Sequence, residues 1–197
     1  MKQGYTYTVI FMFVMSALFT AALAIANAFY LPAIKSNEVL AEKKSILDAL
    51  DIDVPADSNQ VNNIFDKSIR KSSFSGKDVY ENIDETGNVT GYALPFSGPG
   101  LWGTIIGYGG VSGDFSTLLG INFTVQSETP GLGGRIDEAW YKEQFRGISI
   151  KQDGKLEFDP EKSGIDGITG ASITSKSVTN IIKKLVEENV SGLEAVK

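Results

Sequence analysis

The segment DGITGASITS, which runs from Asp166 to Ser175, is the most informative stretch of this chain. It places several hydroxyl groups in a turn just before a helix, and Gly170 allows the backbone to bend tightly there. After the turn, apolar residues recur at helical spacing, with charged residues on the opposite face. A helix N-terminus offers free N–H groups and a partial positive charge, so the turn suits a phosphate. An ordinary N-cap, where Ser and Thr are preferred, explains the same residues.

Two glycine-rich segments precede this turn. SGPGLWG runs from Ser97 to Gly103, and ETPGLG runs from Glu128 to Gly133. In the second segment, Pro-Gly favours a type II turn in which the glycine takes a positive φ. Each segment could be a plain loop beside a strand, with Trp102 in the core and Glu128 as a solvated charge.

Together the three segments resemble the FMN-binding domain family. That family includes the C subunit of the sodium-translocating NADH:quinone reductase and the G subunit of the Rnf electron-transport complex. The C-terminal segment resembles the family's flavinylation motif, D-G-x-S/T-G-A-S/T, and ETPGLG matches a family signature. The resemblance implies FMN attached covalently, through a phosphoester at Ser172, with Thr174 as the alternative acceptor. The chain departs from the family in having Ser172 for the usual threonine, and Gln126 where a histidine is common.

The resemblance also implies the surroundings of the flavin. The LWG residues are expected near the isoalloxazine, and the ETPGLG loop near its pyrimidine edge, with Glu128 accepting N–H bonds from the turn. Asp166 either caps its own turn, belongs to the sequence that a flavin transferase reads, or helps to hold the metal that this transferase uses. No catalytic residue and no metal site of the chain's own is expected. The expected cofactor-binding residues are Leu101, Trp102, Gly103, Glu128, Thr129, Gly131, Leu132, Asp166, Thr169, Gly170, Ala171, Ser172 and Thr174.

Composition excludes several other functions. The formal net charge of −6 argues against nucleic-acid binding, because no basic stripe is present to neutralise phosphates. The chain has no cysteine, which excludes disulfides, iron–sulfur clusters and a catalytic thiol. It has no histidine either, so the usual general base near neutral pH is missing. A bound organic cofactor remains as a route to difficult chemistry.

An uncharged apolar stretch from Tyr7 to Tyr30 is long enough for a transmembrane helix. A cleaved signal peptide is the alternative, since Ala22-Leu23-Ala24 and Ala26-Asn27-Ala28 within the stretch have the spacing of cleavage sites. We expect a retained anchor over residues 1–32 that ends at Pro32, a helical linker region over 33–76 and an FMN-binding domain over 77–197. The resemblance implies a single pass through the cell inner membrane, with the domain on the outer side.

The remaining pattern predicts an α+β fold, with a mainly antiparallel sheet flanked by helices. Strand signals cluster between helical ones and do not alternate regularly with them. We expect helices over about 38–50 and 61–67, strands over 102–108 and 118–125, and hairpins over 77–94 and 149–158, the second turning at Asp153-Gly154.

The expected function is that of a membrane-anchored flavoprotein subunit, which relays electrons through covalent FMN in an ion-translocating NADH:quinone reductase-type complex. Its expected partners are the other subunits of the complex and a flavin transferase, and it is not catalytic alone. The Trp102 segment favours the C subunit of the quinone reductase, while the G subunit of the Rnf complex, in ferredoxin:NAD electron transport, is the alternative. An alternative of another class is a non-redox, membrane-anchored binding or assembly module.

Overall fold

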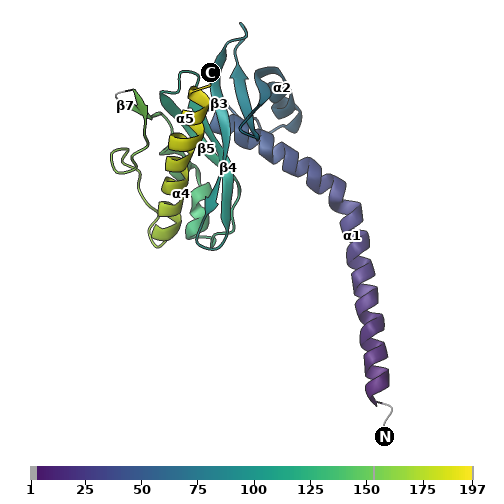
Figure 1. Ribbon diagram of the computed structural model, residues 1–197. Coiled ribbons are helices and arrows are strands. Elements are labelled where there is room, and N and C mark those ends of the chain that lie inside the picture. The colour runs from purple at the N-terminus through teal and green to yellow at the C-terminus, as the bar shows by residue number, and fades with distance from the viewer. Residues whose placement is uncertain (1–3, 153, 197) are drawn as a thin grey trace. The chain divides into compact units, whose positions relative to one another are not determined.

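The structure, a computed structural model, describes residues 4–152 and 154–196, and its centre is a six-stranded antiparallel sheet (Figure 1). Each strand pairs with the next along the chain, so the sheet is a simple meander. The strands are β1 (Ile69–Phe74), β2 (Lys77–Ile83), β3 (Val89–Pro99), β4 (Thr104–Ser112), β5 (Thr117–Val125) and β6 (Ile148–Ser149). The sequence-based prediction of an α+β fold is therefore confirmed.

The C-terminal helical segment covers one face of the sheet (Figure 1). It consists of α4 (Ser172–Lys184), a π-helical turn (Leu185–Val190) and α5 (Ser191–Glu194). Alternate residues of β3 point towards it, because successive side chains of a strand face opposite sides. Tyr92, Leu94 and Phe96 thus join Val178 and Ile182 in the main hydrophobic core.

Short elements complete this layer: the 3₁₀ helix η1 (Gly133–Asp137), α3 (Ala139–Glu143) and the small hairpin of β7 (Lys151–Gln152) with β8 (Lys155–Leu156). The sequence pattern predicted the hairpin but neither η1 nor α3. Asp153, which we expected in the hairpin turn, lies outside the described residues.

The last turns of α1 (Gly4–Ala49) and helix α2 (Ser58–Ser68) cover the opposite face of the sheet. Ile46 and Leu50 pack there against Tyr80 and Ala93. The helix backbone lies directly on β4, since a Cβ atom added to Gly110 would overlap the Ala49 carbonyl oxygen. A glycine is required at this crossing because no side chain fits.

Helix α1 corrects two sequence-based expectations. A helix end at Pro32 and a separate helix from about residue 38 are wrong, because one helix runs through to Ala49 with Pro32 inside it. The end of the membrane anchor itself at residue 32 stays a prediction. A proline removes one backbone hydrogen bond but does not always end a helix. The helix ends instead where Asp51 adopts a left-handed conformation (φ 60°) and the Ile52 N–H donates to the Leu47 carbonyl oxygen at 3.0 Å.

The chain divides into two compact units, one ending at Val39 and one beginning at Leu40. The first unit is the apolar part of α1, which is long and apolar enough to cross a membrane. The second unit contains the sheet and both hydrophobic clusters. Residues 40–49 and strand β1 therefore belong to the globular unit, although both lie within the region 33–76 that we expected to be a helical linker.

Arg146 binds residues 40–49 to the rest of the globular unit. Its guanidinium donates to the Asp48 carboxylate at 2.7 Å and to the Asp48 carbonyl oxygen at 3.0 Å. Lys142 and Asn122 also bind the Asp48 side chain. Because Arg146 is largely buried, these contacts are less screened than a surface ion pair.

These contacts predict where the chain can be truncated. Removal of residues 1–32 should leave a folded domain, whereas removal of residues 1–52 should prevent folding. The longer truncation removes three fully buried or nearly buried side chains, Ile46, Leu47 and Leu50, each worth about 1.5–3 kcal/mol of burial. That sum approaches the whole stability of an ordinary domain, about 5–15 kcal/mol. Circular dichroism melts of the two truncations test this, and equal melting transitions would contradict it.

Candidate functional site

A buried carboxylate joins the three glycine-rich segments. Glu128 is only 4% exposed. Its Oε1 atom accepts hydrogen bonds from the backbone N–H groups of Leu101 at 2.9 Å and Trp102 at 3.0 Å. Its Oε2 atom accepts one from the Thr174 hydroxyl at 2.5 Å. The interpretation of Glu128 as a solvated charge is therefore wrong, and the expected N–H bonds come from the preceding segment.

Two glycines make room for this carboxylate. A Cβ atom at Gly100 would lie 2.5 Å from Glu128 Oε1. A Cβ atom at Gly133 would lie 2.8 Å from Glu128 Oε2 and 2.6 Å from the Thr174 hydroxyl oxygen. Side-chain atoms do not approach so closely without displacing one another, so both positions need glycine for steric reasons. Neither glycine has a positive φ.

The first segment forms a tight turn between β3 and β4. The Gly100 N–H donates to the Gly103 carbonyl oxygen at 2.7 Å, which leaves the amides of Leu101 and Trp102 free to point at Glu128. The two side chains are exposed, Trp102 to 70%. The expectation that Trp102 could be a core residue is wrong. The backbone of this turn is held from inside while its apolar side chains face outward.

The second segment contains the turn that Pro130-Gly131 predicted. The Leu132 N–H donates to the Thr129 carbonyl oxygen at 3.1 Å, and Gly131 has a φ of 76°. Gln126 fixes the start of the segment, because its amide oxygen accepts from the Glu128 N–H and its amide nitrogen donates to Asp137, both at 2.7 Å. Glutamine supplies both a donor and an acceptor, as this position requires.

The third segment brings its own turn to the start of α4. The Ala171 N–H donates to the Ile168 carbonyl oxygen at 2.9 Å, and Gly170 has a φ of 80°. The N-cap residue is Ala171, which makes no side-chain cap. The ordinary N-cap interpretation is therefore wrong, and the N–H groups of the first helical turn have no capping side chain.

The hydroxyl groups of this segment fall into two classes. Thr174 is 1% exposed, and its hydroxyl donates to Glu128. The Ser175 hydroxyl is also buried; it accepts from the Ile168 N–H at 2.9 Å and donates to the Ala171 carbonyl oxygen at 3.1 Å. Thr169 and Ser172, in contrast, are exposed. Two hydroxyls thus hold the turn together, and two face solvent.

Exposed apolar side chains come from all three segments: Leu101, Trp102, Leu132 and Ile173. Leu132 reaches the third segment, since its Cδ2 atom would lie 3.2 Å from a Cβ atom at Gly170. Exposed apolar side chains on segments that are joined in this way are typical of a surface that binds a ligand or a partner.

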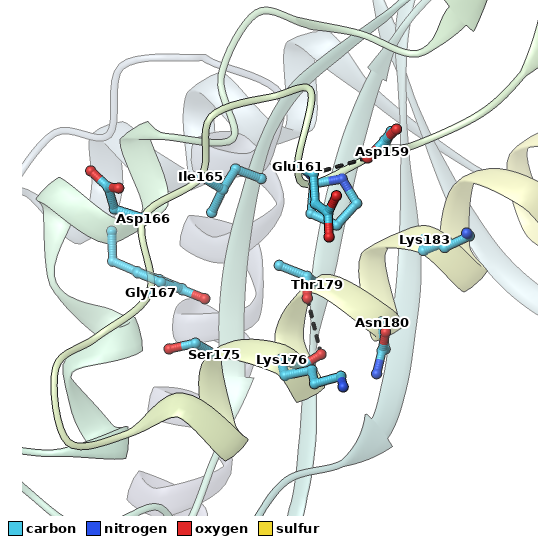
Figure 2. Close-up of a pocket in the computed structure, with 12 residues that line it drawn as sticks. Asp159, Glu161, Ile165, Asp166, Gly167, Ser175, Lys176, Thr179, Asn180 and Lys183 are labelled. Atoms are coloured by element: carbon cyan, nitrogen blue, oxygen red, sulfur yellow. Dashed lines mark hydrogen bonds between the residues drawn. The ribbon is translucent and has the colours of Figure 1, made fainter.

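Asp166 lies at the edge of a separate cavity of about 520 Å³ between the loop 159–167 and α4 (Figure 2). Its backbone N–H and carbonyl group are both bonded to the Gln144 side chain, and no hydrogen bond to its carboxylate is found among the described residues. Ser172 does not line this cavity. No group of three or more metal-ligating side chains is found in the described part of the chain.

Two titrating groups near the site are shifted by their surroundings. Burial raises the pKa of the Tyr141 hydroxyl to about 12, and the nearby Ser175 hydroxyl opposes this only in part. A hydrogen bond from Arg135 lowers the pKa of Glu138, and the Trp140 indole N–H donates to the same carboxylate. Tyr141 therefore stays neutral and Glu138 charged over the whole neutral range.

Sequence reasoning missed three residues of the junction. Gln126 stands out in the sequence only as a departure from the family, and the pattern gives Gly100 and Gly133 no role of their own. Thr174 was expected as a cofactor-binding residue and as the alternative acceptor, not as a partner of Glu128. The spacing of polar residues along the chain gave no signal for contacts between positions 26 to 46 residues apart.

Comparisons with known proteins confirm the resemblance to the FMN-binding domain family. Residues 100–187 match the family described as FMN-binding domain, and this range contains ETPGLG, DGITGAS and the LWG residues. The chain is 37% identical over 114 residues to the C subunit of a Na(+)-translocating NADH-quinone reductase from Pasteurella multocida, and the match covers 54% of this chain and 44% of that protein.

Two further proteins are similar to this chain. The G subunit of an ion-translocating oxidoreductase complex from Methanosarcina acetivorans is 34% identical over 110 residues, covering 55% of this chain and 56% of that protein. A solved structure of the C subunit of a Na(+)-translocating NADH-quinone reductase from Parabacteroides distasonis superposes with a TM-score of 0.67 at 26% identity, covering 81% and 94% of the two chains. The chain spans about half the length of the curated relatives it matches.

The glycine next to the carboxylate provides a stability test of the junction. Gly133→Ala should lower the free energy of unfolding by about 2 kcal/mol, because the new methyl group displaces Glu128 or Thr174 and leaves a buried polar atom unpaired. Gly134→Ala is the matched control. Its methyl group would be 3.3 Å from the Thr129 carbonyl oxygen, so its effect should stay within about 1 kcal/mol. Urea denaturation of both variants measures the difference; equal losses would contradict the packing described.

Proposed function

We propose that this chain is a membrane-anchored flavoprotein subunit that relays electrons through an FMN attached covalently to Ser172, in an ion-translocating NADH:quinone reductase-type complex. The observation that carries the proposal is the junction at Glu128. It brings the LWG turn, the ETPGLG loop and the start of α4 together, and these are the three segments that the family resemblance assigns to the flavin.

The state of the hydroxyl groups supports Ser172 as the acceptor. A phosphoester needs a hydroxyl that a modifying enzyme can reach. Ser172 is exposed and is the first residue of α4, beside N–H groups without a side-chain cap. Those groups and the helix dipole favour the negative charge of a phosphate. Thr174 is a poorer acceptor, because its hydroxyl is buried and donates to Glu128.

The exposed apolar side chains support a flavin ring nearby. Leu101, Trp102 and Leu132 would shield one side of the isoalloxazine from water, and Gly103, Gly131 and Gly170 allow close approach of the backbone. Thr129 and the amides of its turn offer polar groups for the pyrimidine edge. When bound, FMN supplies the one- and two-electron redox chemistry; the chain binds the flavin, orients it and limits its exposure to water.

A covalent tether suits a domain on the outer side of the inner membrane. A freely exchanging flavin would be lost by dilution there, whereas a tethered one keeps a high effective concentration. In this proposal, the apolar part of α1 spans the membrane once, the other subunits of the complex are the electron donors and acceptors, and a flavin transferase attaches FMN. Similarity to both a quinone-reductase C subunit and an oxidoreductase-complex G subunit leaves Rnf-type electron transport as the second candidate.

The acceptor assignment is tested by mass spectrometry. Protein made with a flavin transferase should carry FMN on the tryptic peptide from Ser163 to Lys176, at Ser172. Ser172→Ala should abolish in-gel flavin fluorescence, and Ser172→Thr should keep or increase it. Thr174→Ala should retain covalent flavin, because this hydroxyl is buried. A wild-type protein that stays colourless would favour the non-redox binding or assembly module instead.

The anchor is tested by fractionation. The full-length chain should pellet with membranes and be released by detergent but not by high salt, because a spanning apolar helix is held by lipid and not by charge. Protease added to intact spheroplasts should digest the globular unit if it lies on the outer side. Release by salt would contradict the anchor, and protection from protease would contradict the orientation.

A further inference from the structure

We propose that Glu128 is a positioning residue of the flavin site, which sets the distance between the surface for the ring and the helix start that carries the phosphate, without itself binding the flavin. This inference rests on the proposed function. It goes beyond that function because Glu128 positions the segments around it, whereas the other predicted cofactor-binding residues contact the flavin. The family resemblance alone would group Glu128 with the cofactor-binding residues.

The first argument is that both oxygen atoms are already occupied by the protein. Oε1 accepts from two backbone amides and Oε2 from the Thr174 hydroxyl. A carboxylate only accepts hydrogen bonds, and these three donors are all directed at it. With 4% of the residue exposed, little of it is left for a ligand to touch.

The second argument is that the two oxygens hold different parts of the site. The hydrogen bonds to Oε1 hold the turn that carries Leu101 and Trp102. The hydrogen bond to Oε2 holds the first turn of α4 at Thr174, two residues after Ser172. The carboxylate and its short hydrogen bonds therefore set the distance between Ser172, where the flavin is tethered, and the surface of Leu101 and Trp102, against which the flavin ring lies. Charge-assisted hydrogen bonds of this kind are about twice as strong as those between neutral groups.

The third argument is that the surrounding residues maintain this geometry. The backbones of Gly100 and Gly133 lie close to the two oxygens, and Gln126 holds the Glu128 backbone. A buried side chain whose two oxygens are both held by hydrogen bonds is restricted to one orientation, so it can act as a spacer. Such support around a binding site is what keeps the site geometry fixed before the ligand arrives.

The test separates positioning from general stability by means of a matched control. Glu81 on β2 is a second buried glutamate, 2% exposed, whose carboxylate accepts from Arg70 and Ser72, both outside the three segments. The full-length wild type, Glu128→Met, Glu128→Gln, Thr174→Val and Glu81→Met are each made with a flavin transferase. Covalent flavin, visible circular dichroism of the flavin and melting temperature are measured for each.

The expected result is that Glu128→Met and Thr174→Val carry covalent flavin but lose at least half of its visible circular dichroism, because the ring is no longer held in one orientation. Glu128→Gln should keep more than half, since an amide oxygen can still accept from the two backbone N–H groups. Glu81→Met should lower the melting temperature without changing the flavin signal. Unchanged dichroism in Thr174→Val, or the same loss in Glu81→Met, would overturn the proposal even if Glu128→Met fails to fold.

A flavin-free measurement distinguishes failure of this inference from failure of the proposed function. In a Ser172→Ala background, hydrogen exchange at the Leu101 and Trp102 amides should be at least tenfold faster in Glu128→Met, and unchanged in Thr174→Val, which alters only the other oxygen's partner. Equal exchange in all variants would overturn the role of Glu128. A wild type that never acquires flavin would overturn the proposed function, whatever the exchange rates.

Discussion

The structure around the site depends on one buried carboxylate. Removing a carboxylate from water is costly unless hydrogen bonds replace its hydration, and Glu128 has three donors directed at it. These donors lie 26, 27 and 46 residues away along the chain. They come from the turn between β3 and β4 and from the first turn of α4. A single side chain thus links the three glycine-rich segments at one buried junction.

The same interaction explains features that look unrelated in the sequence. Two glycines are needed beside Glu128 for steric reasons, whereas Gly131 and Gly170 serve their turns through a positive φ. The hydroxyl of Thr174 is bonded inside the protein, whereas Ser172 is exposed to solvent. The LWG turn shows its apolar side chains to solvent because its amides are held from the other side. At the opposite face of the sheet, Arg146 makes the end of α1 part of the globular unit.

Much of the fold and the outline of the site could be predicted from the sequence. Alternation and turn residues placed β2 and β3 with their turn, and the helical period placed α4, because these signals are local. The end of α1 was misplaced because Pro32 was given more weight than the apolar residues that continue beyond it and pack on the sheet. Strand β1 was missed, since IRKSSF lacks apolar alternation and is a strand through its pairing with β2. The segments of the site were recognised by motif, but the partners of Glu128 were not, because a contact between distant turns exists only once the sheet has formed.

The most direct test of the role of Glu128 is a crystal structure of the flavin-loaded protein. We predict electron density for FMN continuous with the Ser172 Oγ atom, the isoalloxazine against Leu101, Trp102 and Leu132, and Glu128 still bonded to its three donors without touching the flavin. Flavin density that leads to another hydroxyl would contradict the acceptor assignment, and a Glu128 oxygen bonded to the ring in place of Thr174 would contradict the positioning role.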